Sequence, residues 1–431
     1  MSANHEIEPS HSANEPASYW QRTAVPFPIS GELPRTVDAL VVGCGVFGAA
    51  VAYWLARSGR RVVLLDRVAV AHGASGRNGG FVVAGMAEDY PAAIRRLGQK
   101  TAQAVMAISY ENQALLRGVL AEEEIDCQYR EPGSLGLAPG EEQFSHLRSD
   151  VEALQADGFS AQLLARDEVQ ELIRTPLAPE ITGGKFLPGQ ALVHSAKLVQ
   201  GLVQAAQRRG AQVYRAQALR LVQDSNSVLV ETNVGRISTG SVVLAVNAWT
   251  DELITGIKGK IVPVRGQALA YAPLKPVFTT AVFASLTETG EYWQQTPDGS
   301  IVLGGCRAHA PGRDVGVREP VPTAEVQAAL EQIFPRLFPQ LGGLQVVQRW
   351  AGLMAFTPDR IPIVDRVPGL ANAWFVGGLS GHGMPFSMLI SQMLAEAVQS
   401  DRTPARLLPF RLDRETISGT DHHSLLSLLS I

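Results

Sequence analysis

After the polar N-terminal residues, the sequence has an apolar run, then apolar residues at helical spacing, then a second apolar run. This order predicts strand, helix, strand. The apolar run over residues 39–42 predicts a buried strand, and small apolar residues at helical spacing over 46–58 predict a helix. A second apolar run over 62–65 predicts another strand, which ends on Asp66. This order predicts one βαβ unit.

Helical and strand-like patterns alternate along the rest of the chain. Helical spacing predicts helices over residues 90–124 with a break near Gly98, 141–156, 166–173, 196–209 and 385–399. A turn leading into a strand is predicted over 131–138, and further strands over 184–193, 212–222, 227–232, 241–246, 266–271, 291–295 and 300–308. The pattern predicts an α/β (α+β) fold, in which a Rossmann-like domain built from separated segments is interleaved with a second, antiparallel sheet.

Length and charge narrow the function classes. The chain has 431 residues, of which 46% are hydrophobic, so it can bury a large core and is too long for one simple domain. Its net charge of −4 leaves no basic face for nucleic acid and no polybasic patch for a membrane surface.

Cysteine usage and the absence of targeting signals favour the cytoplasm. Cys44, Cys127 and Cys306 are scattered, without a CxxC pair or histidines at zinc-site spacing, so no metal site is expected. No run of about 18 apolar residues predicts a membrane span, and the first residues lack the layout of a signal peptide. Residues 1–18 are polar, which predicts disorder, and residues 19–28 predict an arm packed on the body or, preferably, a leader lying on the surface.

The turn between the first predicted strand and helix, residues 43–48, reads GCGVFG. Gly43 fits a tight turn, Gly45 close approach of the backbone to a pyrophosphate, and Gly48 packing of the helix on the strand. Asp66 follows roughly 20 residues later, where a carboxylate can accept hydrogen bonds from ribose hydroxyls and would repel a 2′-phosphate. The unit predicts FAD or NAD rather than NADP; the alternative is a helix-capping turn in another α/β protein.

A second glycine-rich loop covers residues 73–80 and reads GASGRNGG. Its small residues, with Arg77 and Asn78 among them, predict a backbone that approaches a bulky ligand with exposed N–H groups and a positive charge nearby. A nicotinamide enzyme usually needs only the first loop. FAD is longer and would use both loops, so the pair favours FAD.

A third glycine-rich segment lies near the C-terminus. Residues 374–385 predict a strand running into a turn, with Pro385 in the first turn of the next helix. Exposed N–H groups at a helix N-terminus stabilise negative charge, which in a flavoenzyme develops at the N1/C2-carbonyl locus of the reduced ring. The alternative is a plain strand-to-helix connection.

Together these segments resemble a known family. The two glycine loops, the stretch 350–362 and residues 381–384 resemble the D-amino-acid-oxidase/sarcosine-oxidase superfamily of FAD enzymes, and the second loop most resembles the γ-glutamylputrescine oxidase branch. The resemblance runs from about residue 37 to 399. It implies FAD-binding segments 36–125, 194–262 and 347–412, substrate-domain segments 126–193 and 263–346, a flexible N-terminal arm 1–35 and a C-terminal tail 413–431.

The family's chemistry is oxidation of a carbon–nitrogen bond. The resemblance implies that a hydride passes to flavin N5 and leaves an imine that water hydrolyses, with a small amine as substrate, and with oxygen favoured over another electron acceptor, giving hydrogen peroxide. It does not decide between a monomer and a homo-oligomer. The residues that it places at the cofactor are Gly43, Gly45, Val46, Phe47, Gly48, Asp66, Arg67, Ala74, Ser75, Arg77, Asn78, Gly79, Gly80, Leu219, Ala245, Gly378, Gly381, His382, Gly383 and Met384.

The sequence departs from this family at positions that bear on substrate and oxidant. Amino-acid-oxidising members carry an arginine that grips the substrate carboxylate where this chain has Met354 and Ala355, so an amine without a neighbouring carboxylate is favoured. Leu353 lies near the position of a flavin-linking cysteine and Val302 near that of an oxygen-activating lysine. Non-covalent FAD is therefore expected, and the electron acceptor is left open between oxygen and a quinone or carrier protein.

Four side chains are candidates for the reaction itself: His382, Tyr292, Trp293 and Arg307. His382 could act as acid or base, although a structural hydrogen bond in its turn is the favoured alternative. Tyr292 and Trp293 alternate on a strand, so one of them is expected to face the substrate and the other the core. Arg307, or else Arg265, could anchor an anion, with a surface role as the favoured alternative. A FAD-binding protein without catalysis is the remaining possibility.

Overall fold

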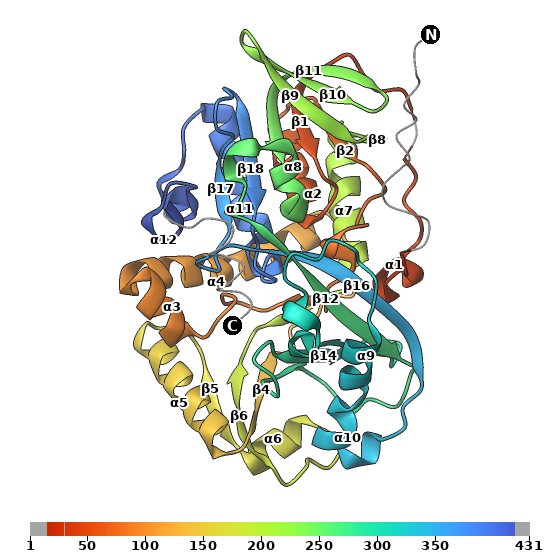
Figure 1. Cartoon of the computed structure of the whole chain (residues 1–431), viewed down its shortest axis with the longest axis vertical. Coiled ribbons are helices and arrows are strands. Elements are labelled where there is room, and N and C mark those ends of the chain that lie inside the picture. The colour runs from red at the N-terminus through yellow and green to blue at the C-terminus, as the bar shows by residue number, and fades with distance from the viewer. Residues whose placement is uncertain (1–14, 30, 419–431) are drawn as a thin grey trace.

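The protein contains two large β-sheets, which lie one above the other. The structure is a computed structural model and describes residues 15–29 and 31–418. In Figure 1 the first sheet and its helices occupy the upper half and the second sheet the lower half, with helix α4 (Gln99–Glu122) running between them. The chain passes between the two halves several times, so each half is assembled from segments that are far apart in sequence.

The first sheet is mostly parallel, and β1 (Thr36–Val42) lies at its centre. β1 pairs in parallel with β2 (Val62–Asp66) on one side and with β11 (Gly235–Leu244) on the other. The sheet order is β17-β18-β11-β1-β2-β8, completed by β8 (Gln212–Arg215), β18 (Ala373–Gly377) and the antiparallel edge strand β17 (Ile363–Arg366). β9 (Ala218–Asp224) and β10 (Ser227–Thr232) extend from β11 as an antiparallel flap.

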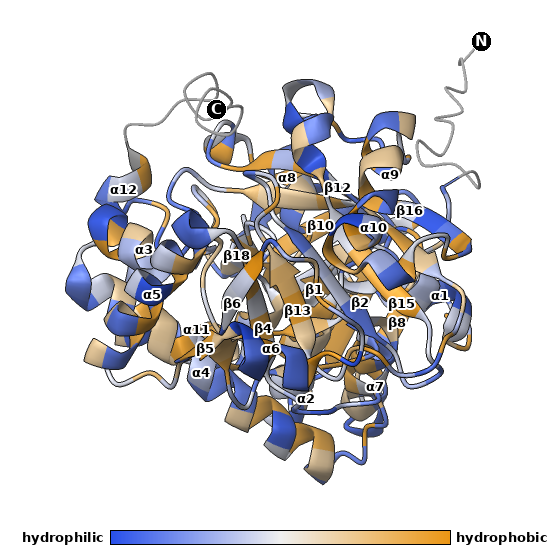
Figure 2. Cartoon of the chain, turned by 90° about the horizontal axis from the view of Figure 1, so that it is seen from below, coloured by the Kyte–Doolittle hydropathy of each residue, from blue (hydrophilic) through white to orange (hydrophobic). Residues whose placement is uncertain are grey.

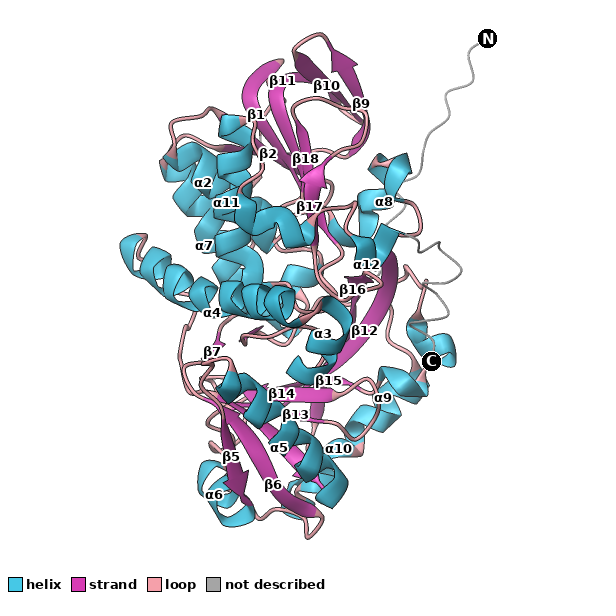
Figure 3. Cartoon of the chain, turned by 90° about the vertical axis from the view of Figure 1, so that its left-hand side faces the viewer, coloured by secondary structure: helices cyan, strands magenta, loops and turns pink. Residues whose placement is uncertain are grey.

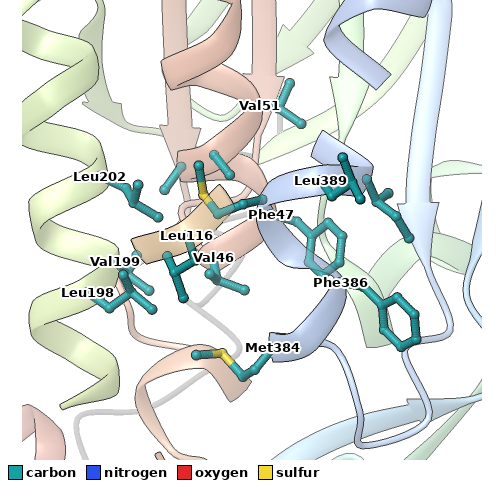
Figure 4. Packing of buried hydrophobic residues seen from close by; sticks show 14 of the residues in the cluster. Val46, Phe47, Val51, Leu116, Leu198, Val199, Leu202, Met384, Phe386 and Leu389 are labelled. Carbon is teal, nitrogen blue, oxygen red and sulfur yellow. The ribbon is translucent and has the colours of Figure 1, made fainter. Parts of the chain in front are cut away.

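Helices α2 (Val46–Arg57), α7 (Ser195–Arg208) and α11 (Ser387–Ser400) cover one face of the first sheet (Figure 3). α2 lies between the other two because its small residues, such as Ala49, Ala50 and Ala52, allow close approach and are fully buried. Figure 4 shows side chains of this core: Phe47 and Val51 of α2, Leu198, Val199 and Leu202 of α7, and Leu389 of α11. Burial of such side chains stabilises the fold by about 1.5–3 kcal/mol each.

The second sheet has the order β16-β12-β15-β14-β13-β4-β6-β5. Its neighbouring strands are antiparallel except for the pair β13 and β4. The strands are β4 (Ser134–Pro139), β5 (Gln162–Ala165), β6 (Ile181–Leu187), β12 (Val262–Tyr271), β13 (Ala281–Ala284), β14 (Glu291–Gln295), β15 (Ile301–Gly305) and β16 (Val346–Phe356). The predicted fold class, a Rossmann-like domain interleaved with an antiparallel-sheet domain, is confirmed.

The remaining helices lie around the two sheets and carry polar residues on their outer sides, whereas apolar residues gather in the central strands (Figure 2). The predicted helix 90–124 is two helices, α3 (Tyr90–Leu97) and α4, and it breaks at Gly98 as predicted, because Gly98 has a φ of +78°. The others are α1 (Tyr19–Thr23), α5 (Glu141–Ala156), α6 (Arg166–Leu172), α8 (Thr250–Leu253), α9 (Ala324–Glu331), α10 (Ile333–Leu337) and α12 (Glu415–Ser418). No helix among the described residues is long and apolar enough to cross a membrane.

Two predicted strands are each divided in the structure. The run 184–193 contains β6 and the short β7 (Ala191–Leu192), which pairs instead with β3 (Phe81–Val82), because the chain turns at Gly189 with a φ of +68°. The run 212–222 contains β8 and β9, which belong to different edges of the first sheet. In both cases the apolar pattern continues across a turn. For this reason the sequence pattern predicts a single strand where the structure has two.

The strand β16 lies in the second sheet, although nearly all of its residues fall in the predicted third FAD-binding segment 347–412. It pairs with β12 from Val262 opposite Phe356 to Tyr271 opposite Val346. The physical reason is the length of β12, whose ten residues need a partner strand along one edge. The first strand of the first sheet after β16 is β17.

Part of the predicted flexible arm 1–35 packs on the body of the protein. Trp20 is 1% exposed, and its indole N–H donates to the backbone oxygen of Asn78 at 2.6 Å. Gln21 donates to the backbone oxygens of Ala71 and His72 at 3.1 and 2.8 Å. We call residues 15–23 the N-terminal strap, because they lie across the second glycine loop. Of the predicted disorder over residues 1–18 and the predicted tail 413–431, residues 1–14 and 419–431 lie outside the described residues, whereas Ser18 is fully buried and residues 415–418 form α12.

Candidate active site

The first glycine loop joins β1 to α2 at the carboxyl edge of the first sheet. Gly43 has a φ of +106°, and an added Cβ would lie 2.6 Å from the backbone oxygen of Ala245 on β11's side. An added Cβ on Gly48 would lie 1.8 Å from the backbone oxygen of Gly43. These glycines therefore allow the turn to close and α2 to pack directly on β1, as their spacing predicts.

Asp66 ends β2 next to this loop and is held in one orientation. Its Oδ2 accepts from the backbone N–H of Cys44 at 2.9 Å. Its Oδ1 accepts from the N–H groups of Val68 and Ala69 at 2.9 and 3.2 Å. Three fixed hydrogen bonds orient the carboxylate, and it reaches the cavity described next.

A cavity of about 320 Å³ lies over the carboxyl edge of the first sheet. It extends from the start of β9 and from α8, past the first loop, to Leu353 of β16 and Leu379. Eleven of the predicted cofactor residues line it: Gly43, Gly45, Val46, Phe47, Asp66, Arg67, Ala74, Ser75, Arg77, Leu219 and Ala245.

Several lining residues carry no sequence motif and were not predicted. Trp249 forms part of the wall, with the Arg67 guanidinium 4.0 Å from its ring centroid and that of Arg318 at 5.2 Å on the same ring. Burial lowers the pKa of Arg67. Gln217 and Glu252 also line the cavity. They come from segments about 150 residues or more beyond the glycine loops, so only the folded sheet order brings them to the site.

The cavity fits an adenine dinucleotide with a second ring system. Side chains at Gly43 and Gly48 would collide with backbone, one at Gly45 would lie 3.0 Å from the hydroxyl of Ser75, and the fixed carboxylate of Asp66 stands at the end of β2. The Ser75 hydroxyl accepts from the N–H of Val46 at 2.9 Å, so the second loop is joined to the first at the start of α2. The residues present therefore suit FAD.

Arg77 of the second loop makes contacts that its sequence position did not predict. It is 6% exposed, and its guanidinium donates to the backbone oxygens of His72 and Ala351 at 2.9 Å and of Pro16 at 3.1 Å. It also pairs with Glu15 at 3.2 Å. Burial lowers the pKa of Arg77, and Glu15 opposes that effect. Arg77 thus holds the loop, the strap and β16 together at the edge of the cavity.

Asn78, Gly79 and Gly80 do not line the cavity. Asn78 accepts from the N–H of Gly80 at 2.8 Å and closes the turn. An added Cβ on Gly79 would lie 2.2 Å from the Phe81 ring, and one on Gly80 would lie 2.8 Å from the Trp20 ring. Glycine is needed at these two positions because side chains of the protein pack closely against the backbone. The sequence analysis gave a different reason, namely close approach of a ligand.

The C-terminal turn follows β18 and faces the second sheet. Gly378 and Gly381 have φ values of +66° and +78°, and an added Cβ on Gly381 would lie 3.2 Å from the sulfur of Met354. Leu379 lines the cavity, whereas Gly48 and the predicted Gly378, Gly381, His382, Gly383 and Met384 are not among its lining residues. The turn therefore lies beside the cavity and in contact with β16 through Met354.

The start of α11 differs from the prediction of exposed N–H groups. The backbone N–H groups of Met388 and Leu389 both donate to the side-chain oxygen of Asn112 on α4, at 2.8 and 3.0 Å. Asn112 is fully buried. A side chain of the protein therefore caps this helix, and only the short turn Met384–Phe386 separates it from the glycine segment.

His382 has an accessible side chain at the apex of this turn, and its backbone N–H donates to the oxygen of Leu379 at 2.8 Å. Desolvation by the surrounding protein lowers the pKa of its imidazole, although an interaction with the backbone of Ser380 raises it. His194, in contrast, caps α7 and contacts the strap: its Nδ1 accepts from the N–H of Lys197 at 3.2 Å, and its Nε2 lies 3.0 Å from the Thr23 hydroxyl.

Tyr292 and Trp293 lie on opposite faces of the second sheet, as their alternation predicts. The Tyr292 ring lies over Gly304, where an added Cβ would be 2.4 Å from its hydroxyl oxygen, and it meets Phe81 at 5.5 Å between centroids. Burial raises the pKa of Tyr292 to about 12. Trp293 is fully buried among Phe278, Phe334 and Phe338, so core packing is the role that the structure gives it.

The two candidate arginines have different surroundings. Arg265 is bound to Asp314 by two hydrogen bonds of 2.9 and 2.6 Å, so it is a structural ion pair. Arg307 is half-buried, with its guanidinium 5.6 Å from the centroid of the Phe356 ring. Burial lowers the pKa of Arg307 to about 10. Among the described residues no group of three or more His, Cys, Asp or Glu could hold a metal ion.

Comparison with known proteins identifies the class. The model of the DAO family, described as FAD dependent oxidoreductase, matches residues 38–397, and the chain belongs to this family. It is similar to the gamma-glutamylputrescine oxidoreductase of Escherichia coli (strain K12), with 27% identity over 373 residues, 85% of this chain and 84% of that protein. It is also similar to the glycine oxidase of Geobacillus kaustophilus (strain HTA426), with 26% identity over 385 residues, 88% of this chain and 97% of that protein.

The fold agrees with this relationship. The crystal structure of glycine oxidase from Geobacillus kaustophilus aligns with a TM-score of 0.78 and 24% identity, and covers 89% of this chain and 100% of that one. The predicted family and the predicted cofactor, FAD, are confirmed. The chain is an FAD-dependent oxidoreductase.

Proposed function

We propose that this enzyme oxidises a carbon–nitrogen bond of an amine whose reacting carbon carries no neighbouring carboxylate, as in a γ-glutamylated or secondary amine. The observation that carries the proposal is Met354. This apolar side chain, at the position where the family's amino-acid oxidases hold an arginine, reaches from Gly266 of β12 to Gly381 of the C-terminal turn. Because Met354 is uncharged, this position offers no cation that could bind an α-carboxylate.

The proposed reaction removes two electrons and two protons from the amine. The carbon loses a hydride and the nitrogen a proton, which gives an imine, and water converts the imine to a carbonyl compound and a free amine. Bound FAD supplies the acceptor for the hydride. With oxygen as the final acceptor, the two electrons and two protons would leave as hydrogen peroxide.

The chain's own residues bind the amine and keep it uncharged. Phe81, Phe283 and Tyr292 form an aromatic group beside the second loop, with ring centroids 5.0 and 5.5 Å apart. Such a partly desolvated place lowers the pKa of a bound amine and so favours the neutral form, which can give up a hydride without a strong base. Tyr292, as a neutral phenol, can donate one hydrogen bond, and the imidazole of His382 can accept a proton at the turn.

Non-covalent FAD is part of the proposal. Leu353 and not a cysteine lines the cavity at the end of β16. Each of the three cysteines is buried, and burial raises the pKa of every one of these thiols, that of Cys127 to about 12. A thiol held in its neutral form is a weak nucleophile. Acid or heat denaturation is expected to release all flavin into the soluble fraction; flavin that stays with the precipitated chain would contradict this part.

An anaerobic substrate screen tests the proposed function. Polyamines, γ-glutamylated amines, N-methyl amino acids and D-amino acids are mixed with the flavin-loaded enzyme, and loss of the visible flavin band is followed. We expect bleaching by amines without an α-carboxylate. Bleaching only by α-amino acids, or by none of these compounds, would overturn the proposal.

A dehydrogenase that passes electrons to a quinone or carrier protein is the second candidate. Val302, fully buried on β15, stands near the place where oxidases of the sarcosine-oxidase type hold a lysine that assists oxygen. Stopped-flow reoxidation of the substrate-reduced enzyme in air distinguishes the two. Fast reoxidation with stoichiometric hydrogen peroxide supports the oxidase, and slow reoxidation that a quinone accelerates supports the dehydrogenase.

A further inference from the structure

Three half-buried arginines gather at one end of the second sheet, and we call Arg307, Arg313 and Arg360 the arginine cluster. Arg307 donates from Nη1 to the backbone oxygen of Arg313 at 2.8 Å. The charges of Arg313 and Arg360 both oppose the charged form of Arg307 and so lower its pKa, which places each of them within electrostatic reach of Arg307. Arg313 and Arg360 have φ values of +54° and +62°, a backbone conformation that L residues rarely adopt.

The protein leaves this positive charge largely unpaired. Arg307 and Arg360 have no ion pair to a carboxylate among the described residues, and Arg313 reaches only Glu288, at 3.9 Å. The Glu288 side chain is 70% exposed, so solvent weakens that pair. Asp314 is nearby, but Arg265 and Gln267 occupy its oxygens. A partly desolvated group of cations with so little counter-charge favours an anionic ligand.

The cluster lies within reach of the C-terminal turn. Met354 contacts that turn at Gly381, and Phe356, which lies under the Arg307 guanidinium, is two residues further along β16 on the same face. Two residues of a strand span about 7 Å. Arg360 follows β16 in the same loop as Thr357, whose N–H donates to the Ser380 hydroxyl at 3.3 Å. The cluster is thus separated from the turn by a distance that a chain of several carbon atoms can bridge.

We propose that the arginine cluster binds a carboxylate at the far end of the substrate, so that the enzyme selects amines with an anionic group several bonds away from the oxidised carbon–nitrogen bond. This inference rests on the proposed function and narrows its substrate class. A guanidinium can hold a carboxylate with two hydrogen bonds, and Phe356 keeps the Arg307 plane in place from the other side. Substrate selection would then depend on a carboxylate far from the oxidised bond, because Met354 stands where the family's amino-acid oxidases hold the arginine that binds a near carboxylate.

The experiment compares three amines that differ at the far end: N-(γ-glutamyl)putrescine, its carboxamide, which has the same size without that negative charge, and putrescine. The flavin-loaded enzyme is assayed in steady state with each. We expect the carboxylate to lower KM by about tenfold to a hundredfold relative to the carboxamide, with kcat little changed, because hydrogen bonds to charged groups contribute about 1.5–3 kcal/mol. Equal KM values for acid and carboxamide would overturn the inference.

Variants locate the effect. Arg307→Met is expected to raise KM for the acid to that of the carboxamide, and Arg307→Lys to keep part of the preference. Arg336→Met is the matched control, since Arg336 is a solvent-facing arginine of the same domain that pairs with Glu180; it is expected to keep the full preference. A preference that survives Arg307→Met, Arg313→Met and Arg360→Met alike assigns the carboxylate to another site and overturns the inference.

The outcomes separate this inference from the proposed function. If none of the amines in the wider screen bleaches the flavin, the proposed function fails. If amines bleach it equally with and without the remote carboxylate, the proposed function stands and the arginine cluster is not its anion site. Flavin content and circular dichroism of each variant show that the folded holoenzyme is being compared.

Discussion

The two glycine loops look alike in sequence but are built in different ways. The first-loop half of the site, residues 39–66, is one contiguous βαβ unit in which Gly48 meets backbone of the same unit and Gly43 meets the backbone of Ala245, directly after β11. The second-loop half comprises the second loop, the strap, the end of β16 and the C-terminal turn, four segments far apart along the chain. The first half depends on local backbone geometry and the second on contacts between distant segments, so substitutions should affect them differently.

The largest expected effect comes from Gly48→Ala in the first-loop half. The added methyl would lie 1.8 Å from the backbone oxygen of Gly43, and backbone cannot move aside cheaply. We expect a loss of about 4 kcal/mol or more in the free energy of unfolding and protein that purifies almost without flavin. Urea unfolding and the ratio of flavin to protein absorbance measure both. Gly118→Ala on α4, where nothing lies within 4 Å, is the control and should be neutral or slightly stabilising.

Trp20→Ala tests the second-loop half through the strap. It removes a fully buried indole and its hydrogen bond to Asn78, so we expect a loss of about 3 kcal/mol or more in unfolding free energy together with weaker FAD binding. Fluorescence titration of the stripped protein with FAD gives the dissociation constant. Val25→Ala, at a side chain that is 81% exposed, should change neither quantity. Unchanged FAD affinity in Trp20→Ala would show that the strap does not support the cofactor site.

Acid should loosen the second-loop half first. Burial lowers the pKa of His194 from 6.5 to about 4, so between these values the unfolded chain binds a proton that the folded chain does not. Stability therefore falls as pH drops from about 6.5 toward 4, by about 2 kcal/mol at pH 5. His194→Asn, which can still accept at the start of α7, should flatten the pH profile of the unfolding free energy in that range. His146→Asn on the exposed side of α5 should leave the profile as it is.

The smallest effect is expected from Asp66→Asn. The amide keeps the size of the side chain but accepts fewer hydrogen bonds from the three N–H groups and from a ribose, so FAD affinity should fall about tenfold with little change in the fold. Isothermal titration of the stripped protein with FAD measures this change. Asp38→Asn, at the other end of β1 and paired with Arg61 on the surface, is the matched control. An unchanged affinity would remove Asp66 from the cofactor site.

The sequence predicts the first-loop half well because its geometry is local. Gly43, Gly45, Gly48 and Asp66 are placed by the turn and the two strands beside them, and strand and helix periodicity locate those elements within a few residues. The fold class and the interleaving of two domains follow from the same patterns. Strand alternation also predicts that Tyr292 and Trp293 point to opposite faces, but it does not say which of them enters the core.

The second-loop half could not be predicted to the same degree, because its contacts join segments with no pattern in common. Nothing in the sequence near Trp20 shows that its indole meets Asn78, or that the guanidinium of Arg77 binds the backbone of Ala351. The cap that Asn112 places on α11 is of the same kind. Backbone carbonyls and N–H groups are identical at every residue, so the partner of a buried side chain is decided only by the assembled fold.

The position of β1 in its sheet has a consequence for biosynthesis. β1 and β2 leave the ribosome early, but β11, which completes β1 on its other side, is made much later, and β16 and β18 follow later still. Until then the Ala245 wall beside Gly43 and the Ala351 acceptor of Arg77 do not exist. The complete cofactor site is therefore assembled only after β16 has been made, and a nascent chain that stalls before β11 holds an early βαβ unit whose apolar β1 edge is open to chaperones or to other nascent chains.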